Sequence, residues 1–320
     1  MQKKQKLSER CAMETRYFNK IKVTDEGTVI KKSDDPVKIA GEWAWMTNKN
    51  ILFKHPKVYS SDISLESGSY VMDFVKGRTM ADLYLNRELS VEIFRQLLEI
   101  FVSVIDMERQ IRFDISEGTD VMKANNYKSK TLSRLKDTEW RDSLEIQYTY
   151  NGTLLPALKD IVEKCNAGIW IKDISYIHGD LCFSNILIVG DCKQFDYAVI
   201  DPRGLSFDRK ISALGDYRYD IAKLAHSVIG RYDDIKASRY CLEYDNKDHC
   251  CNIVFEDSEY NKGLQDIFYN IFGDKLEWYQ IMVNLFLSMI PLHRDHPDHQ
   301  IAMFVNALRL YDEMTKKFDI

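Results

Sequence analysis

One stretch near the middle of the chain constrains its fold more than any other. Residues 178–185 read His-Gly-Asp-Leu-Cys-Phe-Ser-Asn, and an apolar run over 197–200 ends at Asp201. Asn185 follows Asp180 by five positions, and Asp201 comes sixteen positions after Asn185. Phosphoryl transfer from a nucleotide–Mg²⁺ complex needs a base that orients the attacking hydroxyl and two oxygen ligands for the metal. The spacing therefore predicts Asp180 as the base and Asn185 and Asp201 as metal ligands.

The order of the expected elements predicts an α+β chain with two lobes. Strands are expected over 17–24, 28–33, 57–60 and 69–74, with a helix from Pro36 through Met46. Helical spacing follows over 91–111, 130–148, 154–166, 216–229, 259–272, 276–292 and 299–317, and short strands at 187–189 and 198–200 flank the motif. A β-rich nucleotide-binding lobe over residues 1–76 would precede a helical catalytic and acceptor-binding lobe over residues 77–320. This is the arrangement of a protein-kinase-like bilobal fold.

Three passages resemble the aminoglycoside phosphotransferase and choline kinase group of the kinase-like superfamily. They are the loop over 178–185, the run Asp201-Pro202-Arg203-Gly204, and the segment 215–222, which is similar to the helix start after the metal loop. The core motif most resembles uncharacterised phosphotransferase-like proteins from capsule and surface-polysaccharide gene clusters. The resemblance implies ATP or GTP and Mg²⁺ as cofactors and a small-molecule hydroxyl group as the acceptor.

Neighbouring residues have expected structural duties. We group His178 with the predicted catalytic residues. We expect its role to be structural: it should hold the loop through hydrogen bonds to backbone or to Asp201. Asp220 is expected to accept amide hydrogen bonds from the catalytic loop, and Asp216 to cap the helix that follows it.

The first lobe should supply groups that bind the nucleotide. Lys31, at the end of an expected strand, resembles the lysine that contacts the α- and β-phosphates, and Lys32 is the alternative because strand register alone does not exclude it. Glu42, eleven residues after Lys31 on the following helix, is its expected partner. Asp73 and Phe74 lie in the expected hinge between the lobes, where backbone groups would pair with the nucleotide base.

The sequence departs from the kinase-like pattern at the phosphate-covering loop. Residues 1–27 contain one glycine, Gly27, which belongs to a hairpin turn. Thr15, Arg16 or Asn19 would have to contact phosphate in place of a glycine-rich loop. The identity of the nucleotide, ATP or GTP, therefore stays open.

Candidates for the acceptor site lie in three places. Arg203 and Arg209 follow the metal loop, the segment 292–300 concentrates polar groups after an apolar helix, and the patch 127–131 is joined by Arg134. A metal cluster of the histidines within 292–300 is a minority hypothesis, because a proline interrupts helical stacking there.

The acceptor's chemistry stays open at this stage. Choline would need an aromatic cage, for which the candidates are Tyr217, Tyr219, Trp278 and Tyr279. An aminoglycoside would need a strongly acidic pocket, and the C-terminal half has no dense acidic run. A sugar, a polyol, an amino alcohol or a capsule precursor fits as well.

Charge and composition restrict the partners. With 44 basic and 49 acidic residues, the net charge of −5 argues against bulk binding of nucleic acid or anionic membranes. The longest apolar stretch, 281–290, is too short to span a bilayer and predicts a buried helix. Seven scattered cysteines favour a reduced, cytoplasmic setting over a disulfide framework. These features do not predict the oligomeric state.

A small-molecule kinase is the function that these patterns favour. A protein kinase is less favoured, because the span from Asp201 to Gly215 is too short for a long activation segment. A nucleotide-binding pseudokinase or scaffold is suggested by the missing glycine-rich loop. The intact set of Asp180, Asn185 and Asp201 favours catalysis over a scaffold.

Overall fold

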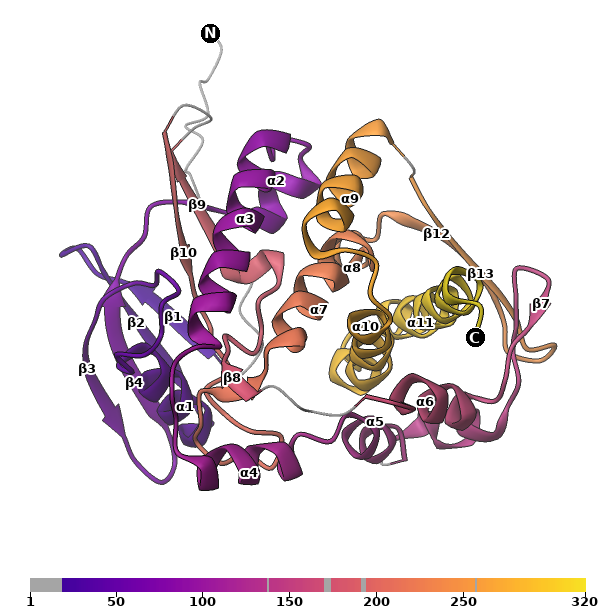
Figure 1. The fold of residues 1–320 in the computed structure, drawn as a ribbon, viewed down its shortest axis with the longest axis horizontal. Helices are drawn as coiled ribbons and strands as arrows, with labels where there is room; N and C mark the ends of the chain where they lie inside the picture. Colours follow the sequence, from indigo (N-terminus) through magenta and orange to yellow (C-terminus); the bar gives the residue numbers. More distant parts are fainter. Residues whose placement is uncertain (1–18, 137, 170–173, 191–193, 257) are drawn as a thin grey trace, which may run out of the picture.

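The computed structural model describes residues 19–136, 138–169, 174–190, 194–256 and 258–320. Its N-terminal part contains β1 (Asn19–Val23), β2 (Thr28–Ser33), α1 (Pro36–Met46), β3 (Val58–Ile63) and β4 (Gly68–Asp73). The strands form an antiparallel sheet in the order β1-β2-β4-β3, and α1 packs against it (Figure 1). The predicted hairpin, helix start and second strand pair are confirmed within the described residues.

Local sequence explains how this part directs its functional side chains. Asp35 caps α1, because its carboxylate accepts a hydrogen bond from the Lys38 amide at 3.1 Å, and Pro36 occupies the first turn, where an amide donor is not needed. Alternate side chains of β2 are buried, since successive residues of a strand point to opposite faces. This alternation turns Lys31 inward and leaves Lys32 exposed.

The C-terminal part is largely helical. It contains α2 (Met80–Leu85), α3 (Val91–Glu108), α4 (Ile115–Ala124), α5 (Tyr127–Lys136), α6 (Leu158–Asn166), α7 (Tyr217–Val228), α8 (Tyr232–Lys236), α9 (Glu259–Phe272), α10 (Leu276–Met289) and α11 (Pro297–Phe318). Helices α5, α6, α7 and α11 pack around α10. All residues of α10 from Trp278 to Met289 are buried. A helix that is apolar on all sides belongs in a core, so the buried helix predicted over 281–290 is confirmed.

Small sheets within the helical part carry the catalytic loop. The strands are β5 (Arg78–Thr79), β6 (Thr149–Tyr150), β7 (Thr153–Leu154), β8 (Ile174–Tyr176), β9 (Ile186–Gly190), β10 (Phe195–Val199), β11 (Leu214–Asp216), β12 (Tyr240–Asp245) and β13 (Cys250–Phe255). They form sheets in the orders β10-β9-β5, β11-β8 and β12-β13-β6-β7. The antiparallel β9–β10 hairpin places Asn185 opposite Ile200, whose amide donates to the Asn185 carbonyl at 2.9 Å. The two halves of the sequence motif thereby lie side by side.

Several expected helices are shorter than the sequence pattern indicated. The helix expected over 154–166 begins only at Leu158, after strand β7, and the one expected over 91–111 ends at Glu108. The helix expected over 130–148 is α5, and a 3-10 turn follows at Glu139–Glu145, where the Thr138 side chain accepts from the Trp140 amide. The helix expected over 276–292 ends at Met289 and continues as a 3-10 turn over Ile290–His293. Pro291 explains this end, because it lacks an amide hydrogen and its ring crowds the preceding turn.

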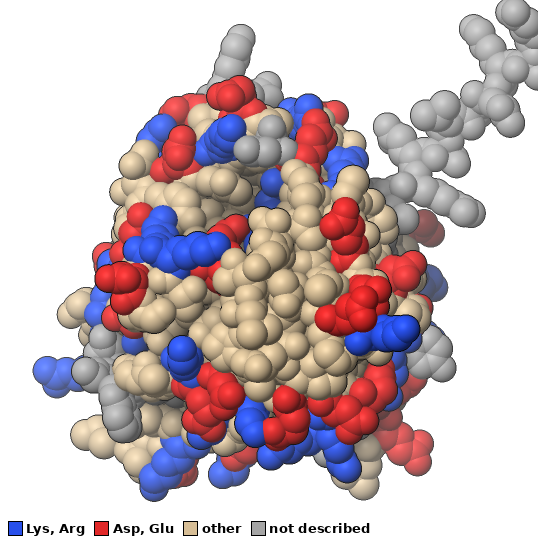
Figure 2. Space-filling view, turned by 90° about the vertical axis from the view of Figure 1, so that its right-hand side faces the viewer, with Lys and Arg blue, Asp and Glu red and all other residues tan. Residues whose placement is uncertain are grey.

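Figure 2 shows the face on the side of α6, α11 and β13. Uncharged residues fill its middle, and acidic and basic side chains are interspersed around them. Within the described ranges, no helix is both long enough and apolar enough for a membrane span.

Candidate active site

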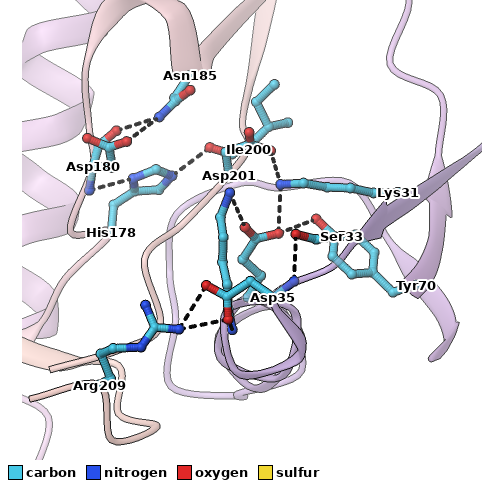
Figure 3. Close-up of polar contacts among 12 residues, drawn as sticks. Lys31, Ser33, Asp35, Tyr70, His178, Asp180, Asn185, Ile200, Asp201 and Arg209 are labelled. Atoms are coloured by element: carbon cyan, nitrogen blue, oxygen red, sulfur yellow. Dashed lines mark hydrogen bonds and ion pairs between the residues drawn. The ribbon is translucent and has the colours of Figure 1, made fainter. Parts of the chain in front are cut away.

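A buried ion cluster joins β2, α1 and Asp201, the second residue after β10. Lys31 Nζ lies 2.7 Å from Glu42 Oε2 and 2.8 Å from Asp201 Oδ1 (Figure 3). The Tyr70 hydroxyl donates to the same Glu42 oxygen at 2.9 Å, and Lys38 Nζ lies 3.4 Å from the other oxygen. The Lys31 and Glu42 side chains have no exposed surface, whereas 32% of the Asp201 side chain is exposed. Asp201 is therefore the member of the cluster that a ligand can reach.

Charge compensation keeps Lys31 and Asp201 ionised. Burial alone would raise the pKa of the Asp201 carboxyl, but the Lys31 ammonium outweighs burial and holds that pKa below its ordinary value. Burial also opposes the charge of Lys31, and the Asp201 and Glu42 carboxylates outweigh it, so the pKa of Lys31 rises. Because Lys32 is exposed and turned away, the structure identifies Lys31 as the inward-facing lysine.

Helix α1 is fixed to the loops that carry the motif. The Trp45 indole donates to the Ile177 carbonyl at 2.7 Å, and its ring meets the edge of the His178 ring with centroids 5.3 Å apart. The backbones of Gly41 and Gly204 meet so closely that a Cβ on Gly204 would lie 2.0 Å from the Gly41 carbonyl oxygen. Gly204 also has a φ of +58°, in the left-handed region that favours glycine. These contacts set the position of Glu42 relative to the C-terminal part.

Hydrogen bonds to buried groups fix the backbone of the catalytic loop, residues 178–185. The Asp220 carboxylate accepts hydrogen bonds from the amides of His178 and Gly179 at 2.7 and 2.8 Å. Burial lowers the pKa of His178 to about 4, so its ring is neutral at physiological pH. With the proton on Nε2, the ring donates to the Ile200 carbonyl at 3.0 Å and its Nδ1 accepts from the Asp180 amide at 3.3 Å. These bonds agree with the structural duties expected for His178 and Asp220.

Asp180 is oriented by two side chains. Lys223 Nζ lies 2.7 Å from its Oδ1, and Asn185 Nδ2 donates to its Oδ2 at 3.1 Å and to its carbonyl at 2.9 Å (Figure 3 draws the Asn185 bonds). The Asp180 side chain is 35% exposed, so a substrate can reach it. Burial opposes the charge of Lys223, but Asp180 outweighs burial and raises the pKa of Lys223. The sequence interpretation missed Lys223, although it follows Asp220 by three residues and shares that residue's helix face.

The backbone of the expected hinge is partly engaged within the protein. The Asp73 amide donates to the Lys57 carbonyl at 2.9 Å, and the Phe74 amide donates to the Gly27 carbonyl at 3.1 Å. Pairing of a nucleotide base with these two amides, one form of the hinge prediction, is therefore excluded in this conformation. Pairing of a base with other backbone groups of the hinge stays a prediction.

Some sequence candidates lie outside the site or outside the described residues. Thr15 and Arg16 fall among residues that the structure does not describe, and Asn19 begins β1. Arg209 turns toward α1, where its Nη2 lies 2.7 and 2.8 Å from the two carboxylate oxygens of Asp35 (Figure 3). In this conformation the Arg209 guanidinium is paired across the two parts of the molecule, and its contact with the acceptor stays a prediction.

Two aromatic candidates for the acceptor pocket are wrong, because both side chains are buried. Trp278 and Tyr279 are each 2% exposed and belong to a cluster with Phe268 and Tyr269, so they do not line an open pocket. The segment 292–300 joins the end of the 3-10 turn to the start of α11 and is largely exposed, and its role in closing an acceptor pocket stays a prediction. In the part of the chain that the structure describes, no three His, Cys, Asp or Glu side chains are arranged to hold a metal.

Other acceptor candidates do come together beside the catalytic loop. Arg203 Nη2 donates to the Tyr219 hydroxyl at 2.7 Å, and Lys130, from the predicted patch 127–131, donates to the same hydroxyl at 3.4 Å. The Arg203 amide donates to the His178 carbonyl at 2.9 Å, which ties this group to the loop of Asp180. A small cavity adjoins the group, and its lining includes Tyr127, Gly179, Arg203, Phe207 and Tyr219.

Comparisons with known proteins identify the fold. No protein-family model matches the sequence, and no curated protein matches it significantly. The structure is similar to an apo thermostable mutant of an aminoglycoside phosphotransferase, with a TM-score of 0.51, 10% identity and coverage of 89% of this chain and 87% of that one. A protein from Haemophilus somnus assigned as a fructosamine-3-kinase gives a TM-score of 0.50 at 12% identity, covering 92% of this chain and 87% of that one.

A ligand-bound structure of the aminoglycoside phosphotransferase is also similar to this chain. This ternary complex with ADP and hygromycin B gives a TM-score of 0.50 at 9% identity and covers 92% of this chain and 93% of that one. The α+β bilobal architecture predicted from the order of elements is confirmed: the chain has the kinase-like fold that aminoglycoside phosphotransferases and fructosamine-3-kinases share.

Proposed function

We propose that the chain is a small-molecule kinase that transfers the γ-phosphoryl group of ATP or GTP to a hydroxyl group of its acceptor. The observation that carries this proposal is the connection of Lys31 to both Glu42 and Asp201, in the same structure that pairs Asp180 with Asn185. A lysine, its helix glutamate and a metal-binding aspartate must be in place together for phosphoryl transfer in kinase folds. The nucleotide would bind residues of the lobe over 1–76, and the acceptor those of the lobe over 77–320.

Each side chain has a role in this proposal. Lys31 would contact the α- and β-phosphates, and Glu42 would hold it. Asp180 would accept the proton of the acceptor hydroxyl, with Lys223 and Asn185 keeping its carboxylate in one orientation. His178 would hold the loop through its neutral ring rather than exchange a proton, because burial keeps its pKa near 4.

The residues present suit a magnesium ion that arrives with the nucleotide. Among the described residues, no hydrogen bond engages the Asn185 side-chain oxygen, and Asp201 has one oxygen on Lys31 and an exposed edge. One or two protein oxygens together with substrate phosphates are the usual magnesium ligands in nucleotide-dependent enzymes. The bound ion would neutralise charge on the phosphates, while Asn185 and Asp201 would hold it.

The acceptor is proposed to be a small molecule rather than a peptide. The loop after Asp201 folds back on itself through a bridge between Leu205 and Ile211 and a bond from the Ser212 amide to the Gly204 carbonyl at 3.0 Å. Such a compact loop offers no extended segment on which a peptide could lie. The neighbours named above are kinases of small molecules, and a sugar, an amino alcohol or a surface-polysaccharide precursor in the cytoplasm is the acceptor that we propose.

Thermal stabilisation by nucleotides tests the proposal. We expect ATP or GTP with Mg²⁺ to raise the melting temperature, because a ligand that binds the folded state stabilises it. Asp201→Ala should remove the dependence on Mg²⁺, whereas Asp180→Ala should keep nucleotide binding and lose turnover of a true acceptor. Asp196→Ala, an exposed carboxylate on β10 that pairs with Lys54, is the control and should behave as wild type. No stabilisation by either nucleotide would contradict the proposed function.

A further inference from the structure

Two cationic side chains contact one hydroxyl near the proposed base, and a third contacts the base itself. Arg203 Nη2 lies 2.7 Å and Lys130 Nζ 3.4 Å from the Tyr219 hydroxyl. Lys223, one turn further along α7 than Tyr219, contacts Asp180 at 2.7 Å. We call Lys130, Arg203 and Lys223 the cationic group. Burial lowers the pKa of Lys130, and the charges of Arg203, Arg134 and Lys223 lower it further.

The carboxylates near the cationic group are engaged elsewhere. Asp216 receives the Arg218 guanidinium at 2.8 Å, and Asp220 receives the two backbone amides of the catalytic loop. Among the residues that the structure describes, no carboxylate oxygen lies within ion-pair distance (4.0 Å) of Lys130 or Arg203. Asp180 therefore faces an excess of positive charge on this side.

Aromatic rings hold these cations in place. Lys130 Nζ lies 3.8 Å from the centre of the Phe207 ring, and the Arg203 guanidinium lies 4.8 Å from that of Tyr219. Rings attract cations but bring no negative charge. Burial, followed by the nearby cations, lowers the pKa of Lys130 well below its usual value, and the charge of Asp180 only partly opposes this shift. Because Asp180 is itself in contact with Lys223, a bound anion would add negative charge that the site lacks. The Lys130 and Arg203 side chains are only half-buried, which leaves room for a ligand to approach.

We propose that the acceptor carries a carboxylate or phosphate group, which Lys130 and Arg203 bind while its hydroxyl faces Asp180. This inference rests on the proposed kinase function and names the class of its acceptor. A guanidinium and an ammonium that converge from two elements, α5 and the loop after Asp201, suit an anionic group. The same charges would repel a polycationic aminoglycoside or a quaternary ammonium, so the cationic group selects against both.

Anion binding provides the first test. The full chain is saturated with Mg²⁺ and a non-hydrolysable ATP analogue, and the melting temperature is followed as inorganic phosphate or acetate is added, with chloride at equal ionic strength as the blank. We expect stabilisation beyond the chloride blank. Lys130→Met and Arg203→Gln should each weaken the apparent affinity about 10-fold, the value of a charge-assisted contact. If Arg203→Gln does not fold, Arg203→Lys is measured in its place, because it keeps the positive charge.

A matched control lies on the same helix. Lys136 at the end of α5 is exposed, so Lys136→Met should bind phosphate as wild type does. Stabilisation by phosphate and acetate no greater than by chloride, or wild-type affinity in both Lys130→Met and Arg203→Gln, would overturn the inference.

Turnover of matched sugars provides the second test and separates the two proposals. Nucleotide consumption is measured with glucose, glucosamine, glucuronate and glucose 6-phosphate. We expect kcat/KM to be at least about 10-fold higher for an acidic member than for glucose or glucosamine, and the two acidic sugars distinguish carboxylate from phosphate. Preference for the neutral or cationic sugar would contradict this inference alone. Absence of nucleotide binding would contradict the proposed function. If none of the four is a substrate, the anion-binding result decides.

Discussion

The cations on the two sides of the catalytic loop have different partners. On the nucleotide side, Lys31 is completely buried and contacts two carboxylates, Glu42 and Asp201. On the acceptor side, Lys130 and Arg203 share a hydroxyl and aromatic rings, and the described residues place no carboxylate against them. The first cluster is complete before any ligand binds. The second leaves its charge to be balanced by whatever occupies the site.

This difference indicates that one side of the loop determines the type of reaction and the other determines which acceptor binds. A compensated cluster can hold its geometry without a ligand, so Lys31 is pre-organised for a group that every nucleotide carries. An uncompensated cluster costs stability in the free protein, and the cost is relieved only by a ligand of opposite charge. The nucleotide side thus serves the chemistry, and the acceptor side serves discrimination among acceptors.

The largest effect is expected from removing the cation on the compensated side. Lys31→Met would remove the ammonium in contact with Asp201 and leave Glu42 with the partly exposed Lys38 as its cationic partner. Breaking a buried pair in this way costs about 3–5 kcal/mol of unfolding free energy. Urea denaturation measures it. Lys32→Met, at the neighbouring exposed position, should change stability by less than about 0.5 kcal/mol. Equal losses in the two variants would show that the Lys31 cluster contributes little to the fold.

The next effect concerns the loop after Asp201, which begins with Asp201 on the nucleotide side and carries Arg203 on the acceptor side. Gly204→Ala would put a Cβ 2.0 Å from the Gly41 carbonyl oxygen at a φ of +58°. We expect a loss of about 2–3 kcal/mol in unfolding free energy from overpacking and backbone strain. Gly263→Ala is the control, because α9 leaves open space around Gly263 and alanine there should stabilise by up to about 1 kcal/mol. A wild-type melting curve for Gly204→Ala would contradict the close docking of α1.

The nucleotide side was the more predictable one, for a physical reason. Asp180, Asn185 and Asp201 are separated by short, regular segments, so a hairpin brings them together whatever the rest of the chain does. Glu42 follows Lys31 on the next element of the chain, and their pairing needs only a strand followed by a helix. The choice of Lys31 over Lys32 needed the structure, because both sit at the end of the same strand.

The acceptor side depends on contacts between distant segments. Lys130 comes from α5, Arg203 from a loop and Lys223 from α7, and no spacing within the sequence relates them. The helical pattern of 130–148 also overran the true end of α5, since a helix pattern does not reveal where tertiary packing stops it. Arg209 looked equivalent to Arg203 in the sequence, but it reaches Asp35 instead. Which of two nearby arginines faces a site is decided by the path of the loop.

A buried carboxyl group at the end of α3 differs from both sides of the catalytic loop, because burial favours its protonated form. This group predicts that the stability of the protein depends on pH. No cation among the described residues pairs with Glu108; its Oε1 accepts the Leu52 amide at 2.7 Å, and burial raises its pKa to about 8. The folded protein therefore keeps a proton that the unfolded chain releases above its ordinary pKa near 4.5. The stability that this proton confers is complete below about pH 4.5 and is lost as the pH rises toward 8.

Glu108→Gln, the neutral counterpart of the protonated acid, should remove this dependence. We expect it to exceed wild type by on the order of 2 kcal/mol in unfolding free energy at pH 8 and to equal wild type near pH 5. Denaturation curves at both pH values measure the difference. Glu99→Gln, on the exposed face of α3, should follow wild type throughout. A glutamine variant that is less stable than wild type at pH 8 would mean that Glu108 is ionised and favourable in the folded protein.

The smallest effect has the opposite sign to the first. Lys130→Met removes a cation that other cations oppose, and methionine keeps a comparable apolar stem against Phe207 and Tyr219. We expect the free protein to gain up to about 1 kcal/mol in unfolding free energy, because functional sites often hold groups that cost stability. Lys136→Met should change little. Since Lys31→Met destabilises by the same measurement, one urea series on these three variants decides whether the two sides differ as the contacts indicate. A loss of stability in Lys130→Met would show that its charge is compensated in the free protein after all.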